Sequence, residues 1–138
     1  GYVLMQAQQR AGGLCWRYWF DYVAEAEHAT YTNGAWHGNE VPYVFDTLGQ
    51  VEPSRQYVNE RDLAFAAQVA DYWVSFARDA GARDSLVGPT RWPACRKGRD
   101  VLLRIGVNKH AGFRLENRFM RARMSLFKRV MKHHVSLD

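Results

Sequence analysis

Residues 15–23 constrain the fold of this chain more than any other segment, because they read Cys-Trp-Arg-Tyr-Trp-Phe-Asp-Tyr-Val. Aromatic residues favour β-strands, so this run predicts a strand. Successive side chains of a strand point to opposite faces, and the even-numbered positions 16, 18, 20 and 22 are all aromatic. The odd-numbered positions combine Trp19 with the charged Arg17 and Asp21. A central parallel strand is apolar on both faces, so this mixture predicts a strand at or near a sheet edge.

Helical patterns and turn residues divide the rest of the first hundred positions. Residues 2–10 are good helix formers that stop before a Gly-Gly pair, whereas residues 24–42 are rich in turn residues and predict a long irregular connection. Residues 60–80 predict an amphipathic helix with Asn59 as N-cap and Gly81 as its stop. The apolar positions that fall at helical spacing, and are expected to face the core, are Leu63, Ala66, Ala67, Ala70, Trp73, Val74 and Ala77.

The last third of the chain is basic. Gly and Pro predict a loop over residues 81–100, and residues 101–105 predict a short strand. A second amphipathic helix is predicted from about 115 to 133, with Phe119, Ala122, Leu126 and Val130 on one side and most of the cations on the other. Residues 96–138 hold twelve Lys/Arg and three Asp/Glu, against seven and eleven in residues 1–95. Such an asymmetry indicates either an anionic partner or a solvated face that balances the rest of the protein.

Composition sets the class of protein. The chain has 138 residues, of which 47% are hydrophobic and 24% charged, and this is typical of one folded domain. No apolar run approaches the roughly 20 residues of a membrane-spanning helix, and no targeting segment is visible. We therefore expect residues 1–138 to form a single soluble unit, and the sequence leaves its compartment open.

No complete active site is visible as a motif. A phosphate-binding glycine loop, a zinc-protease motif and a Gly-x-Ser-x-Gly turn are all absent from the sequence. The two cysteines, Cys15 and Cys95, are too few for a disulfide framework or a zinc site, and no pair of histidines has metal-ligand spacing with a third ligand. The sequence therefore predicts no metal and no cofactor.

One histidine differs from the others in its surroundings. His37 lies in a turn-rich loop just after the aromatic strand, and functional residues are frequent on such loops. Residues 37–45 read His-Gly-Asn-Glu-Val-Pro-Tyr-Val-Phe, after Tyr-Trp-Phe-Asp-Tyr-Val at residues 18–23. This arrangement resembles the catalytic-histidine segment of type B carboxylesterases, the family that includes cholinesterases and bacterial para-nitrobenzyl esterases.

Two later stretches extend the resemblance. Residues 72–77 read Tyr-Trp-Val-Ser-Phe-Ala and residues 92–93 are Trp-Pro, as in a helix and the following loop of that family. Two departures fall in surface loops: residues 81–84 replace a frequent Gly-Asp-Pro-Asn, and Cys95 stands where an aromatic residue is frequent. The resemblance covers residues 1–105, whereas residues 106–138, interpreted as a basic amphipathic helix, do not match.

The resemblance implies an α/β fold, namely the C-terminal portion of an α/β-hydrolase. This portion comprises the final core strand, the catalytic-histidine loop and flanking helices, and it is helix-rich when taken alone. His37 would be the catalytic base of a serine esterase that acts on a small carboxylic ester. Glu40 would provide a polar contact beside the site, and Trp36 and Gly38 would lie at its pocket, although packing is an equal explanation for Trp36. In this fold the chain order is Ser, then Asp/Glu, then His, so the nucleophile and the acid would lie upstream.

Two consequences follow for partners and activity. Without its serine the isolated chain is expected to be inactive, and the upstream hydrolase portion, or a complementary chain, would have to supply Ser and Asp/Glu. One strand cannot form a sheet, so residues 15–23 need a partner: residues 101–105, the rest of the hydrolase, or a second copy through self-association.

Two other functions remain open. The chain is either the His-bearing part of an esterase or a non-catalytic interaction module in which His37 is idle. It could also bind an anionic partner, either nucleic acid or a membrane surface, through the basic face of residues 118–132, and a salt series would reveal such binding. No recognised nucleic-acid motif supports nucleic acid as that partner.

Overall fold

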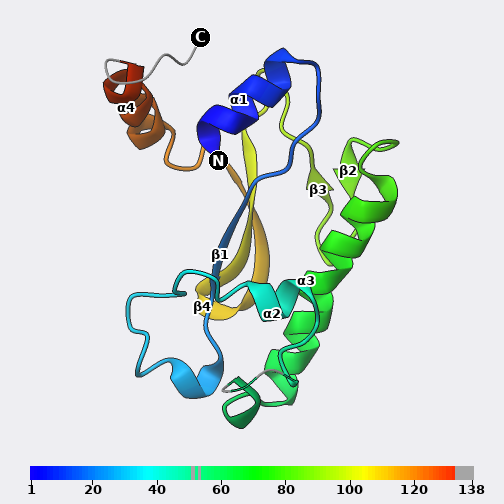
Figure 1. The fold of residues 1–138 in the computed structure, drawn as a ribbon, viewed down its shortest axis with the longest axis vertical. Helices are drawn as coiled ribbons and strands as arrows, with labels where there is room; N and C mark the ends of the chain where they lie inside the picture. Colours follow the sequence, from blue (N-terminus) through cyan, green and yellow to red (C-terminus); the bar gives the residue numbers. More distant parts are fainter. Residues whose placement is uncertain (51, 53, 133–138) are drawn as a thin grey trace.

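The computed structural model describes residues 1–50, 52 and 54–132. Its elements are arranged around one parallel strand pair, with the longest helix along one side (Figure 1). The helices are α1 (Tyr2–Arg10), α2 (Val41–Val44), α3 (Glu60–Asp79) and α4 (Arg121–Lys132), and the strands are β1 (Tyr18–Tyr22), β2 (Ser85–Leu86), β3 (Trp92–Pro93) and β4 (Val101–Asn117). The helix predicted over residues 2–10, the strand within 15–23 and the helix over 60–80 are confirmed.

The central pairing joins two strands that are far apart in the sequence. β1 runs parallel to β4, with Tyr18 opposite Leu103 and Phe20 opposite Ile105, before the register shifts. The shift lies beside Gly106, whose φ is +83°. A Cβ on Gly106 would lie 2.4 Å from the backbone nitrogen of Tyr22, so only glycine permits this close approach. Among the described residues, no strand pairs with the other edge of β1.

β4 is longer than predicted because it turns back on itself. Asn108 and Lys109 have φ values of +52° and +71°, the left-handed conformations that tight hairpin turns use. The Arg118 N–H donates to the Asp100 carbonyl at 2.9 Å and closes the two ends of the hairpin. Figure 1 shows the two arms of β4 side by side. The prediction of a helix from residue 115 was therefore wrong at its start: Leu115 lies in the strand, and α4 begins at Arg121.

The predicted alternation of the aromatic strand is confirmed. Its even-numbered face packs against α2 and α3, whereas on its odd-numbered face Arg17 pairs with Asp100, and Asp21 accepts a hydrogen bond from Arg104 at 2.6 Å. Offset or edge-to-face ring contacts add to the stabilisation from burial. The ring pairs of the even face are Trp16–Phe76, Tyr18–Trp73, Phe20–Tyr43 and Tyr22–Phe65, with centroids 5.5, 5.1, 5.1 and 4.5 Å apart.

The long helix α3 is positioned by its first turn. Asn59 is the N-cap, as predicted, and its side chain accepts from the backbone N–H groups of Arg61 and Asp62. The Asp62 carboxylate accepts in return from the Asn59 N–H at 2.8 Å, which completes a capping box.

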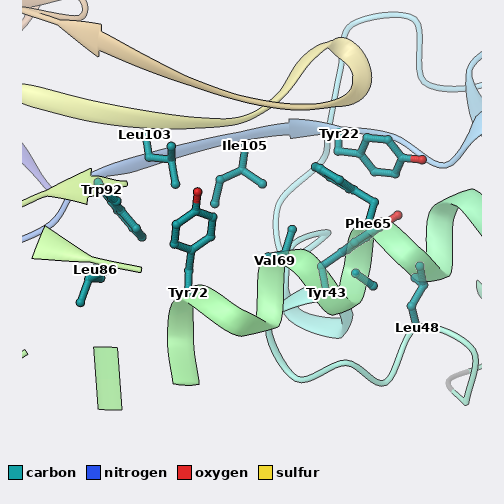
Figure 2. Close-up of a cluster of buried hydrophobic side chains, with 11 residues drawn as sticks. Tyr22, Tyr43, Leu48, Phe65, Val69, Tyr72, Leu86, Trp92, Leu103 and Ile105 are labelled. Carbon is teal, nitrogen blue, oxygen red and sulfur yellow. The ribbon is translucent and has the colours of Figure 1, made fainter. Parts of the chain in front are cut away.

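The face of α3 that points to the core is only partly the predicted one: Ala66 is buried and Trp73 packs against the core, as expected. Leu63 and Val74 are exposed by 41% and 60%, although both were expected inside. Apolar residues surround this helix on several sides, so spacing alone does not identify the buried stripe. Figure 2 shows Leu103 and Ile105 of the sheet pointing toward the helix that carries Val69 and Tyr72. The buried residues of α3 are Asp62, Phe65, Ala66, Val69, Tyr72 and Ser75.

The C-terminal helix α4 lies beside α1 (Figure 1). Met124 is half-buried, and the Lys128 Nζ donates to the Gln6 side chain of α1 at 2.7 Å. Leu126 and Val130, predicted on the apolar side of this helix, are both exposed by more than half. No helix among the described residues is both long and apolar enough to cross a membrane.

Candidate functional site

His37 lies in the loop that connects β1 to α2. The imidazole is exposed, not enclosed in the hydrophobic core. In open α/β sheets, ligands bind beyond the carboxyl ends of the parallel strands, and this loop leaves the carboxyl end of β1. Two contacts that follow His37 in the chain, one at the end of the loop and one in α2, hold the histidine segment in place.

The first contact is a buried hydrogen bond from the loop to the strand. The Asn39 side chain is only 6% exposed, and its Nδ2 donates to the Tyr22 carbonyl, the last residue of β1, at 2.9 Å. Because Asn39 is two positions after His37, this bond holds the histidine segment against the end of the strand.

The second contact is the side chain of Tyr43 in α2. Tyr43 is 1% exposed, and its ring lies against those of Phe20, Tyr22 and Phe65. Burial and the negative charge of nearby Asp62 raise the pKa of the Tyr43 hydroxyl, so this residue stays neutral and acts by packing. The short helix is thereby fixed to the core just after the histidine.

Around His37 and Asn39 the backbone makes two consecutive tight turns. The Asn39 N–H donates to the Trp36 carbonyl and the Val41 N–H donates to the Gly38 carbonyl, each at 3.2 Å. Gly38 has a φ of +83°, which favours glycine, and no atom lies within 4 Å of the position of a Cβ there. Gly38 is therefore required by the backbone conformation and not by a lack of space.

The two other residues predicted at the site lie on either side of His37. The Trp36 ring is exposed by 38% and stacks on Tyr31, with centroids 4.1 Å apart. Glu40 is half-buried and precedes the first turn of α2. Burial and the charge of Glu40 raise the pKa of the Tyr18 hydroxyl, so this carboxylate lies within electrostatic range of the aromatic face of β1.

Within residues 1–50, 52 and 54–132, His37 makes no ion pair and no side-chain hydrogen bond. The same residues contain no group of three or more His, Cys, Asp and Glu side chains that could hold a metal ion. A pocket of about 780 Å³ lies between α1, the start of β1 and the start of α4, and no residue of the His37 loop lines it. The backbone around His37 is thus held in place, and its imidazole is free to contact groups from outside the described residues.

A buried polar cluster beneath the loop was not predicted. Asp62 is fully buried and accepts hydrogen bonds from the Tyr22 hydroxyl, the Glu25 N–H at 3.3 Å and the Asn59 N–H at 2.8 Å. Burial and the bond to Asp62 raise the pKa of Tyr22, which keeps its proton. The cluster ties the end of β1 to the start of α3. The Asn-x-x-Asp spacing at residues 59–62 was the signal in the sequence that could have revealed it.

A pair of histidines lies near the tip of the β4 hairpin. The rings of His28 and His110 are 5.2 Å apart in an edge-to-face arrangement, and the His28 Nε2 is 2.8 Å from the Val23 carbonyl. Lys109 donates to the His28 carbonyl at 3.2 Å. These contacts connect the segment after β1 to the hairpin.

Known proteins resemble this chain in sequence and in fold. A sequence profile of the carboxylesterase family matches residues 2–126, which extends beyond residue 105 into α4. No curated protein matches the sequence. An esterase from anaerobic Clostridium hathewayi, described as able to hydrolyze aliphatic aromatic polyesters, has a similar structure with a TM-score of 0.64 and 19% sequence identity.

The match covers 91% of this chain but only 23% of that esterase, so the chain spans about a quarter of its length. The structural similarity confirms the predicted fold class, a portion of an α/β-hydrolase with a parallel strand pair and flanking helices. The sequence match extends over most of the 138 residues. This chain therefore belongs to the carboxylesterase family.

Proposed function

We propose that this chain contributes the catalytic histidine of a serine carboxylesterase, and that His37 is that residue. The observation that carries the proposal is an exposed imidazole on a loop held by Asn39 and Tyr43, in a chain of the carboxylesterase family. Histidine is the side chain best suited to accept and return a proton near neutral pH. The serine and the triad acid come from residues outside this chain.

In the proposed reaction, His37 removes the proton of the serine hydroxyl while the serine oxygen attacks the ester carbonyl. The imidazolium then gives this proton to the leaving alcohol, and an acyl-enzyme remains. His37 next removes a proton from water, which attacks the acyl carbonyl and releases the carboxylic acid. The proton finally returns to the serine oxygen, so the histidine ends each cycle unchanged.

Neighbouring residues position the imidazole in this scheme. Gly38 provides the left-handed backbone that turns the chain directly after His37. Glu40 is a polar neighbour and not the triad acid, since the acid of this fold precedes the histidine along the chain. Trp36, stacked on Tyr31, forms an aromatic surface beside the site.

The proposal implies that the chain works together with an upstream portion. A two-stranded sheet is at best marginally stable alone, and β1 has one edge without a strand among the described residues. Leu63, Val74 and Phe76 of α3 are also exposed, which adds apolar surface for a neighbour. We expect the 138 residues alone to lack esterase activity and to recover it when the serine-bearing portion is supplied, covalently or as a separate chain.

Hydrolysis of a short-chain nitrophenyl ester tests this proposal. In a protein that contains both portions, His37→Ala should lower kcat by roughly 10⁴- to 10⁶-fold, as loss of a triad member does. Thr32→Ala, which changes an exposed side chain of the same loop, is the matched control and should leave kcat unchanged. Activity that survives His37→Ala would refute the assignment, as would activity of the isolated chain.

A further inference from the structure

The two cysteines, 80 positions apart, are neighbours in the fold. Cys15, just before β1, and Cys95, just after β3, face each other in an isolated antiparallel bridge. The Cys95 N–H donates to the Cys15 carbonyl at 2.7 Å. Both thiols are free in this structure.

The pairing of the two residues gives a Cα spacing that suits a disulfide. Residues directly opposite each other in a hydrogen-bonded antiparallel pair have Cα atoms about 5.5 Å apart, and their side chains lie on the same face. Disulfides span Cα separations of about 4.4 to 6.8 Å, most often about 5.5 to 6 Å. The Cα separation typical of such a pair thus lies within the range that a disulfide spans, and small local adjustments bring the two sulfur atoms into bonding distance.

The two thiols differ in access. Cys95 is fully buried, and its Sγ donates to the Val101 carbonyl at 2.9 Å. Cys15 is half-buried and lies in the wall of the pocket of about 780 Å³ between α1 and α4. A small reagent that enters this pocket reaches Cys15, whereas Cys95 is reached only from Cys15.

We propose that Cys15 and Cys95 form a reversible intrachain disulfide, and that Cys15 reacts first with a small disulfide such as oxidised glutathione. The Cys15 sulfur attacks one sulfur of the small disulfide, so that a mixed disulfide forms and one small thiol leaves with the proton. The Cys95 sulfur then attacks the Cys15 sulfur of the mixed disulfide and releases the second small thiol, which takes the Cys95 proton. Two protein thiols are oxidised, and one small disulfide is reduced to two thiols.

The surroundings make this exchange slow at neutral pH. Burial and the adjacent Cys95 raise the pKa of the Cys15 thiol to about 11, and burial also raises the pKa of Cys95. Since the thiolate is the nucleophile, the rate should increase by about tenfold for each pH unit well below that value. The pair is thus suited to a disulfide that forms slowly and links the segment before β1 to the segment before β4.

The test uses the folded protein that contains this chain. It is incubated with oxidised glutathione at about pH 7 and about pH 9, the remaining thiols are alkylated, and the peptides that carry each cysteine are identified by mass spectrometry. We expect a peptide that links Cys15 to Cys95, formed faster at the higher pH. Cys95→Ser should instead accumulate glutathione on Cys15, and Cys15→Ser should leave Cys95 unmodified.

Two results would overturn the inference. One is a wild-type protein that keeps glutathione on Cys15 and never forms the link. The other is a wild-type protein whose cysteines both stay free under conditions that modify Cys15 in Cys95→Ser. Cys95→Ala serves as a second variant, in case serine at this buried position disturbs folding.

Discussion

Replacing Asn39 by alanine should loosen the His37 loop while leaving the rest of the core intact. The substitution removes one hydrogen bond, 2.9 Å long, from a side chain that is 6% exposed, and the Tyr22 carbonyl loses this partner. Loss of a buried hydrogen bond with an unsatisfied partner costs about 1–3 kcal/mol, so we expect the free energy of unfolding to fall by about 2 kcal/mol. The Tyr43 contact remains, so the loop stays attached at its other end.

The same loss should appear in catalysis. If the whole loss acts on the loop, the equilibrium between the positioned and the displaced loop shifts by about 2 kcal/mol. The fraction of molecules with the imidazole in position then falls by up to about 30-fold. We therefore expect kcat for ester hydrolysis to fall by roughly tenfold or more, with a smaller change in KM, because the substrate pocket is not altered. Urea unfolding followed by tryptophan fluorescence measures the first effect, and steady-state kinetics the second.

The matched control is Asn33→Ala, because Asn33 lies in the same loop but is exposed. This variant should change the free energy of unfolding by less than about 0.5 kcal/mol and leave kcat unchanged. If Asn39→Ala is as stable as the wild type, the bond makes no net contribution. If stability falls while kcat is unaffected, the bond does not position His37, and our reasoning about the loop is wrong.

Two further predictions concern the sheet. Gly106→Ala should destabilise the protein more than Gly98→Ala. Both residues have φ near +84°, but only a Cβ at Gly106 meets the backbone of β1. Equal unfolding midpoints of the two variants in denaturant would contradict this prediction. Burial raises the pKa of the Glu116 carboxyl, but hydrogen bonds from Arg114 and Arg104 outweigh it and hold that pKa below its usual 4.5. Its stabilising effect should therefore be complete above pH 4.5 and be lost as the pH falls below that value, so wild-type stability should drop more steeply in acid than that of Glu116→Gln. Parallel stability curves for the two proteins would refute the second prediction.

The sequence locates the helices better than it identifies their buried faces. The ends of α3 follow from Asn59 and the breaker at Gly81, since capping is local chemistry. Which face of α3 points inward depends on where the aromatic side of β1 packs. A hydropathy pattern along the helix contains no information about that contact. Val69 and exposed Val74 are equally apolar, yet only Val69 meets the core.

The hairpin of β4 was missed for a related reason. Gly106 and Asn108 interrupt the apolar pattern after the first arm and suggest the end of a strand. In the fold they instead provide the close approach to β1 and the left-handed turn. A residue that breaks a pattern locally can therefore be the one that the tertiary structure requires.

At the candidate site, the sequence predicted the position of His37 but not what holds it. The resemblance placed this histidine in a loop after the strand, and the structure has it there. The partner of Asn39 could not be predicted, because an amide can bond to any nearby carbonyl and only the fold determines which one is near. The role of Asp62 depends likewise on Tyr22, 40 positions earlier in the chain.

The parallel pairing of Tyr18 with Leu103 also determines when β1 can be completed during synthesis. A ribosome that adds about 5–20 residues per second needs roughly 4 to 17 seconds to translate the intervening stretch. The aromatic rings of the nascent strand meet α2 and α3 before β4 is made, so its side chains can be covered while its backbone edge is still unpaired by β4. An unpaired strand edge is prone to association, and on the β4 side this exposure ends only when β4 has been synthesised.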